Sequence, residues 1–154
     1  MSLATDTRLI LSEGELEGSL ELFMLAEAAL WSVADAALEN DPNRFGRGHY
    51  RIAFLVERRP GAGVRELAAL TGLSKQGASR TLRELEAAGL VAKTPGEEDA
   101  RRRPAVLTDA GRVFVRGVSE RMRAHLAFAY RAGGLDAVAG AQRILTALAV
   151  RAML

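Results

Sequence analysis

The chain contains no cysteine and only two histidines among its 154 residues. The absence of cysteine excludes disulfides, thiolate metal sites and redox sensing through thiols. The histidines, His49 and His125, share no ligand motif with each other or with nearby carboxylates, so no metal site is expected. No Gly-rich phosphate loop, nucleophile elbow or Ser-His-Asp set is visible. The sequence therefore argues against an enzyme and predicts no catalytic residue, cofactor or metal.

Long hydrophobic runs are missing as well. Glu27 and Asp35 interrupt the longest apolar stretch, which falls short of the length needed to cross a bilayer. No signal peptide pattern is visible, so we expect a cytoplasmic location. A chain of 154 residues corresponds to about one domain and is long enough to bury a hydrophobic core. We therefore expect residues 1–154 to form a single domain.

The net charge of +2 conceals an uneven distribution of charge along the chain. Residues 1–45 contain nine acidic and two basic residues, whereas residues 46–154 contain ten acidic and nineteen basic residues. A basic part of this kind indicates a nucleic acid partner, and the acidic part is expected to lie away from it.

A helix with two distinct faces is predicted after Ser74, a good N-cap residue, and before Gly89, a good C′ residue. At about 100° per residue, one face carries only polar or basic side chains, and the opposite face is suited to a core. The polar face comprises Lys75, Gln76, Ser79, Arg80 and Arg83, and the opposite face comprises Ala78, Thr81, Leu82 and Leu85. Arg, Lys and Gln side chains of such a face can donate to base edges, while Ser can bond phosphate.

The segment before this helix shifts the interpretation from an ordinary solvated face towards DNA. Val64–Thr71 is predicted as a short helix, joined to the next by the tight turn Gly72-Leu73. Two helices across such a turn form a helix-turn-helix, whose second helix enters the major groove. Ser74, at its start, would cap the helix against a phosphate.

A β-hairpin with a basic tip follows the second helix. Its strands are predicted at Leu90–Lys93 and Pro104–Leu107, with a Pro-Gly turn between them. Arginines at such a tip either extend into water or contact phosphate and the minor groove. The tip carries Arg101, Arg102 and Arg103. We expect Asp99 to fold back and brace Arg101.

These motifs together resemble the winged helix-turn-helix core of the MarR family of transcription regulators. The matching positions lie between about Gly48 and Gly111. They are Gly72-Leu73-Ser74-Lys75-Gln76, Ser79-Arg80, Leu82, Leu85-Glu86, Gly89-Leu90-Val91, Asp99 with Arg101, and Leu107-Thr108-Asp109-Ala110-Gly111. Residues 48–108 are accordingly expected to form the DNA-binding core.

Helices are predicted on both sides of that core, over residues 12–40 and 109–153. Ser12 to Glu15 fits a capping box at the start of the first helix, and Thr108 caps the second segment, which Gly133-Gly134 interrupts. Both segments carry more apolar residues than one chain needs, which favours a homodimer. The MarR resemblance implies the same role for these helices. The expected fold is mainly α with a small β-hairpin: a winged helix-turn-helix core flanked by N- and C-terminal dimerisation helices.

The sequence thus predicts a homodimeric regulator that binds double-stranded DNA at a roughly palindromic operator, and more specifically a repressor. The resemblance implies release by a small aromatic or anionic ligand, although no residue identifies that ligand. Trp31 and Phe54 are candidates to line a ligand pocket, but core packing is the favoured role for both. The alternative is a winged helix used as a protein-interaction module without specific DNA binding.

Overall fold

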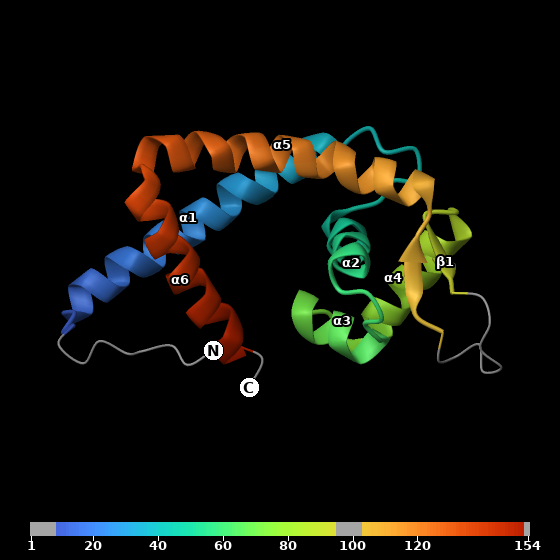
Figure 1. The fold of residues 1–154 in the computed structure, drawn as a ribbon, viewed down its shortest axis with the longest axis horizontal. Coiled ribbons are helices and arrows are strands. Elements are labelled where there is room, and N and C mark those ends of the chain that lie inside the picture. The colour runs from blue at the N-terminus through green and yellow to red at the C-terminus, as the bar shows by residue number, and fades with distance from the viewer. Residues whose placement is uncertain (1–8, 95–102, 153–154) are drawn as a thin grey trace. The chain divides into compact units, whose positions relative to one another are not determined.

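The structure, a computed structural model, describes residues 9–94 and 103–152, which form six helices and two strands (Figure 1). The elements in chain order are α1 (Glu13–Leu38), α2 (Arg47–Arg58), α3 (Val64–Thr71), α4 (Lys75–Ala87), β1 (Val91–Lys93), β2 (Ala105–Leu107), α5 (Asp109–Gly133) and α6 (Leu135–Ala152). The chain divides into two compact units, Val33–Ala124 and the two ends of the chain up to Ser32 and from His125. Within the described ranges, every helix is too short or too polar to cross a membrane.

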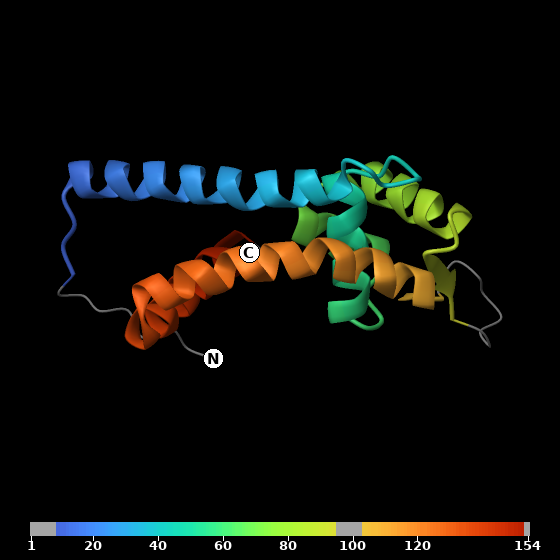
Figure 2. The same ribbon diagram turned by 90° about the horizontal axis from the view of Figure 1, so that it is seen from above.

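The first helix begins at the predicted capping box. The Ser12 N–H donates to Glu15 Oε2 at 2.8 Å, and the Glu15 N–H donates to Ser12 Oγ at 3.3 Å. The backbone and hydroxyl hydrogen bonds from Ser12 hold the pKa of Glu15 below its usual value. Figure 2 shows α1 as one unbroken helix, which ends at Leu38, two residues before the predicted end.

The core of the unit Val33–Ala124 lies among α2, α3, α4 and the hairpin. Ile52, Leu67 and Leu85 are fully buried there, one from each of the three helices. Side-chain hydrogen bonds add to this apolar packing: the Tyr50 hydroxyl lies 2.9 Å from the Ser119 hydroxyl in the buried interior. The predicted helix-turn-helix and its following strands therefore share one hydrophobic core.

The turn between α3 and α4 has the geometry that its sequence indicates. Gly72 has a φ of 71°, in the left-handed region that glycine adopts without a steric penalty. Ser74 then caps α4, because its Oγ accepts a hydrogen bond from the Gly77 N–H at 2.9 Å. The predicted bounds of the short helix, Val64 and Thr71, are confirmed.

The wing follows directly from the end of α4. Gly89 adopts a φ of 73°, and the Leu90 N–H donates to the Leu85 carbonyl, which closes the helix end. Strands β1 and β2 then pair antiparallel, with Val91 opposite Leu107. Both strands are one residue shorter at the start than predicted, because Leu90 belongs to the closing turn and Pro104 precedes the ladder.

The junction between the wing and α5 is unusually close. Thr108 Oγ1 accepts from the Gly111 N–H at 3.0 Å, as expected of a helix cap, and donates to the Gly89 carbonyl at 2.6 Å. A Cβ atom at Gly111 would overlap the Leu90 carbonyl oxygen. Helix α5 ends as predicted at Gly133, and the next residue, Gly134, has a φ of 82°.

Candidate DNA interface

Helix α4 separates its polar and apolar side chains as the sequence predicts. Ala78, Thr81, Leu82 and Leu85 are buried in the core, whereas the basic residues of the polar face are exposed. On the polar face Lys75, Gln76, Arg80 and Arg83 are exposed, and Ser79 is half-buried. The polar face is therefore presented to solvent and not to the protein's own core. Its contact with DNA stays a prediction.

The first turn of α4 is stabilised by its side-chain cap. With the Ser74 hydroxyl engaged by Gly77, its role as the helix cap is confirmed, while its phosphate contact stays a prediction. Gly77 suits this turn because a Cβ at that position would lie 3.1 Å from Ser74 Oγ, closer than side chains normally approach. Lys75 is the first residue of α4, so its basic side chain lies at the positive end of the helix dipole.

Of the three arginines predicted at the tip of the wing, only Arg103 falls within the described residues. Asp99, Arg101 and Arg102 lie outside the described residues, so their predicted roles stay predictions. Arg103 is described and is half-buried, so it does not simply extend into water. The base of the wing is ordered by Thr94, whose N–H and hydroxyl both donate to the Pro104 carbonyl, at 3.1 and 2.7 Å.

One contact to α4 is not foreseen by the sequence. His49 Nε2, on α2, lies 2.6 Å from Glu84 Oε2 on α4, and Arg80 Nε lies 3.9 Å from the other carboxylate oxygen of Glu84. The sequence predicts no contact between His49 and α4. Because 35 residues separate the two partners, no local spacing reveals this pair.

Another ion pair joins α2 to the end of α1. Arg47 donates two hydrogen bonds to the Asp35 carboxylate, at 2.8 and 2.6 Å. This hydrogen bonding by Arg47 holds the pKa of Asp35 below its usual value. The pair thus connects the last turn of α1 with the first residue of α2.

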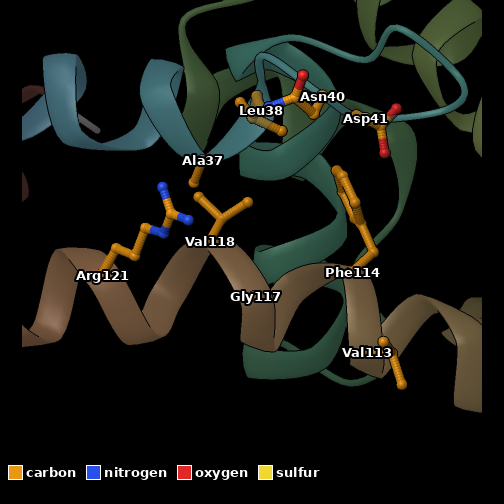
Figure 3. A pocket seen from close by; sticks show the side chains of 9 residues that line it. All are labelled: Ala37, Leu38, Asn40, Asp41, Val113, Phe114, Gly117, Val118 and Arg121. Carbon is orange, nitrogen blue, oxygen red and sulfur yellow. The ribbon is translucent and has the colours of Figure 1, made fainter.

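A cavity of about 270 Å³ lies between α5 and the segment that ends α1. Leu38 and Val118 contribute apolar surface, Phe114 a ring, and Arg121 and Asp41 the charged groups. Figure 3 shows Phe114 and Arg121 projecting from α5 towards the end of α1 and its loop. Arg121 Nη1 donates to the Ala36 carbonyl at 3.5 Å, and Asp41 accepts from the Asn43 and Phe45 N–H groups at 3.0 Å each. The hydrogen bond of Arg121 to the Ala36 carbonyl is therefore longer and weaker than the two that Asp41 accepts.

The two aromatic side chains proposed from the sequence as pocket residues do not line this cavity. Phe54 is half-buried on α2, and its ring centroid lies 5.8 Å from that of Tyr50. Trp31 is also half-buried and belongs to the other unit. The signal that marks the cavity, an arginine seven residues after a phenylalanine on one helix, is too common to be selected from sequence alone.

In the described part of the chain, no three His, Cys, Asp or Glu side chains gather in a way that could hold a metal ion. The observed site is instead a capped helix with an exposed cationic face, beside a two-stranded wing. This combination defines a winged helix-turn-helix protein.

The comparisons with known proteins identify the family. Residues 45–102 match the MarR family. The chain is 36% identical to the HTH-type transcriptional regulator PetP of Rhodobacter capsulatus, over 96% of this chain and 88% of PetP. Two solved structures are similar. One is the Mycobacterium tuberculosis MarR family protein RV2887 in complex with p-aminosalicylic acid (26% identity, 83% of this chain and 95% of that one, TM-score 0.62). The other is CouR of Rhodococcus jostii RHA1 bound to p-coumaroyl-CoA (25% identity, 83% and 89%, TM-score 0.65).

The chain therefore belongs to the MarR family of DNA-binding transcriptional regulators. It is a regulator and not an enzyme. The predicted fold, mainly helical with a two-stranded wing, is confirmed.

Proposed function

We propose that this protein is a homodimeric repressor that binds a roughly palindromic operator through the polar face of α4. The observation that carries the proposal is the separation of the two faces of α4. Arg80 and Arg83 are exposed while Leu82 and Leu85, on the opposite face, are buried. Exposed arginines on a recognition helix supply the bidentate donors that read guanine and the charge that attracts phosphate. The wing arginines at positions 101 to 103 would engage the flanking backbone or minor groove.

The exposed apolar surfaces of the terminal helices support the dimer. Leu16, Leu20 and Met24 on α1 are more than half exposed, as are Ile144 and Leu148 on α6. Apolar surface of this extent is typical of an interface. A twofold pair would present two α4 helices to successive major grooves, about one helical turn apart.

We further propose that an aromatic acid bound in the cavity between α5 and the end of α1 releases the operator. RV2887, a MarR family protein, is known in complex with p-aminosalicylic acid, and CouR is known bound to p-coumaroyl-CoA. Here Arg121 offers a guanidinium for a carboxylate, and Phe114 offers a ring for stacking. A protein regulated in this way binds DNA less tightly once the cavity is filled.

The test begins with the selection of bound duplexes from a random pool. Arg83→Ala should weaken binding to the selected operator by roughly 5- to 150-fold, because a good base contact is worth about 1–3 kcal/mol. Arg116→Ala, which removes another exposed charge, from α5, is the matched control and should change affinity little. Retention of partner proteins without any selected duplex would instead support a protein-interaction module.

The effector proposal needs a separate measurement. Salicylate or a coumarate should lower operator affinity of the wild type, and Arg121→Ala should abolish this response while operator affinity without effector is kept. A response that survives in Arg121→Ala would place the effector elsewhere.

A further inference from the structure

His49 is held from three directions at the start of α2. Its Nδ1 accepts a hydrogen bond from the Gly46 N–H at 3.3 Å, and its Nε2 lies 2.6 Å from Glu84 Oε2. The Phe45 ring stacks on the imidazole, with ring centroids 4.1 Å apart and planes within 9°. Since Gly46 has no side chain, His49 alone supplies the cap at this end of α2. The same side chain therefore caps one helix and contacts another.

The hydrogen bonds determine the role of each ring nitrogen in neutral His49. The Gly46 amide can only donate, so Nδ1 accepts through its lone pair. Nε2 then carries the ring proton and donates it to the Glu84 carboxylate, which can only accept. A short bond to a charged acceptor belongs to the stronger class of hydrogen bonds.

Glu84 has a second cationic neighbour, Arg80, one turn earlier on α4. Arg80 Nε lies 3.9 Å from Glu84 Oε1, at the outer limit of an ion pair, and the Arg80 side chain is 73% exposed. A basic residue that precedes its acidic partner by four positions forms the weaker of the two possible helix pairs. One carboxylate thus faces two donors, and His49 holds it at the shorter distance.

We propose that His49 is a positioning residue for DNA binding. By holding the Glu84 carboxylate, it prevents that carboxylate from closing on Arg80, so the Arg80 guanidinium stays available to the duplex. The inference rests on the proposed function, because it requires the polar face of α4 to contact DNA. Without His49, Glu84 would pair with Arg80 more closely and oppose its contact with phosphate.

A set of combined variants tests this competition in operator binding. His49→Ala should weaken binding about twofold for each protomer, since exposed ion pairs four residues apart are of that strength. Glu84→Gln removes the negative charge but keeps an acceptor for His49, and it should strengthen binding. Adding His49→Ala to Glu84→Gln, or to Arg80→Ala, should then leave affinity unchanged. His49→Gln, whose amide can still donate to Glu84, should restore most of the wild-type affinity.

A purely structural role of His49 produces a different pattern. His49→Ala would then lower operator affinity by the same factor whether or not Glu84 and Arg80 are present, and that result would overturn the inference. Thermal unfolding of the same variants separates the two effects: the loss of melting temperature should persist in the Arg80→Ala background, where the loss of affinity disappears. If His49→Ala does not fold, His49→Phe decides, because it keeps an aromatic ring beside Phe45 but cannot donate to Glu84: it must weaken binding when Arg80 is present and leave it unchanged in Arg80→Ala.

Arg83→Ala distinguishes this inference from the proposed function. Unchanged affinity in Arg83→Ala would show that the polar face of α4 does not contact the operator, and the proposed function would fail. Weakened affinity in Arg83→Ala, together with an effect of His49→Ala that persists in Glu84→Gln, would overturn only the role of His49.

Discussion

Thr108 connects three parts of the DNA-binding core through its own hydrogen bonds. Its N–H donates to the Leu90 carbonyl at 3.0 Å, its hydroxyl donates to the Gly89 carbonyl, and the same oxygen accepts from the Gly111 N–H. The residue therefore closes α4, starts α5 and joins both to the wing. Backbone groups at the end of α4 and the start of α5 gain a partner in this way.

At Gly111, the absence of a Cβ is required by space. Gly111→Ala would force the new methyl group onto the Leu90 carbonyl oxygen and within 3.2 Å of Leu107 Cδ2. We expect a loss of about 1–3 kcal/mol in the free energy of unfolding, the usual cost of overpacking. Urea denaturation measures it.

The control for this substitution is Gly117→Ala in the same helix. A Cβ at Gly117 meets nothing within 4 Å, so alanine should stabilise the helix by about 0.5–1 kcal/mol. If both substitutions had the same effect, the close approach at Gly111 would not be the cause.

Asp35 gives a prediction for the pH dependence of stability. Arg47 holds the pKa of Asp35 in the folded protein below the ordinary value of an aspartate, which the side chain has in the unfolded chain. The contribution of the pair is therefore complete above that value and is lost as the pH falls through the lowered folded pKa. Asp35→Asn should reduce stability at neutral pH, and its difference from wild type should shrink in acid below about pH 4. Urea unfolding at a series of pH values measures this.

Arg47→Gln serves as the control because it removes the group that lowers the pKa of Asp35. It should produce the same change in the pH profile as Asp35→Asn. A difference between wild type and Asp35→Asn that stays constant with pH would contradict the assignment to this pair.

At the scale of single elements, the sequence predicts the helices and strands well and their mutual contacts poorly. Ser74, Gly72 and Gly89 determine where α3 and α4 begin or end, because capping and left-handed backbone depend on adjacent residues. His49 and Glu84 leave no such trace: neither residue's local pattern indicates a partner.

The same limit applies to the candidate site. The polar face of α4 could be read from its period, since exposure follows directly from the opposite face being apolar. The cavity beside Phe114 could not, because it depends on how α5 lies against the end of α1. Ion pairs such as Asp35 with Arg47 likewise require the packing of two helices to be known.

The wing is the element whose contribution to DNA binding can be separated from that of α4. Replacing Arg101, Arg102 and Arg103 together by Ala should lower the slope of log affinity against log salt by up to about three for each protomer, if all three contact phosphate. Titrations of the operator at several salt concentrations measure the slope. An equivalent triple variant on α5, at Arg112, Arg116 and Arg123, should leave the slope nearly unchanged.

At the scale of the whole molecule, the apolar surfaces of α1 and α6 determine the expected assembly. Leu20 is 60% exposed in the single chain, and the neighbouring apolar residues of α1, among them Leu16 and Met24, are exposed as well. Water contact of this kind is unfavourable by about 25 cal/mol for each Å² of apolar surface, which association would recover. The acidic residues of the first 45 positions would then lie away from the operator.

Leu20→Lys should therefore dissociate the dimer, because a charge would be buried in an apolar interface without a partner. Sedimentation at several protein concentrations should show a monomer, and operator affinity should fall far more than for a change on one half-site. Glu21→Gln, which changes the net charge by the same amount on the same helix, should stay dimeric. A dimeric Leu20→Lys variant would place the interface elsewhere.

The tight junction at Gly111 has a mechanical consequence. Since the backbone of Gly111 rests against Leu90 and Thr108 bonds to Gly89, the hairpin has no hinge of its own at its base. If the first turns of α5 tilt, the base of the hairpin must therefore move with them. A small rotation of the start of α5 is thus passed on to β1 and β2 through Leu90 and Gly89.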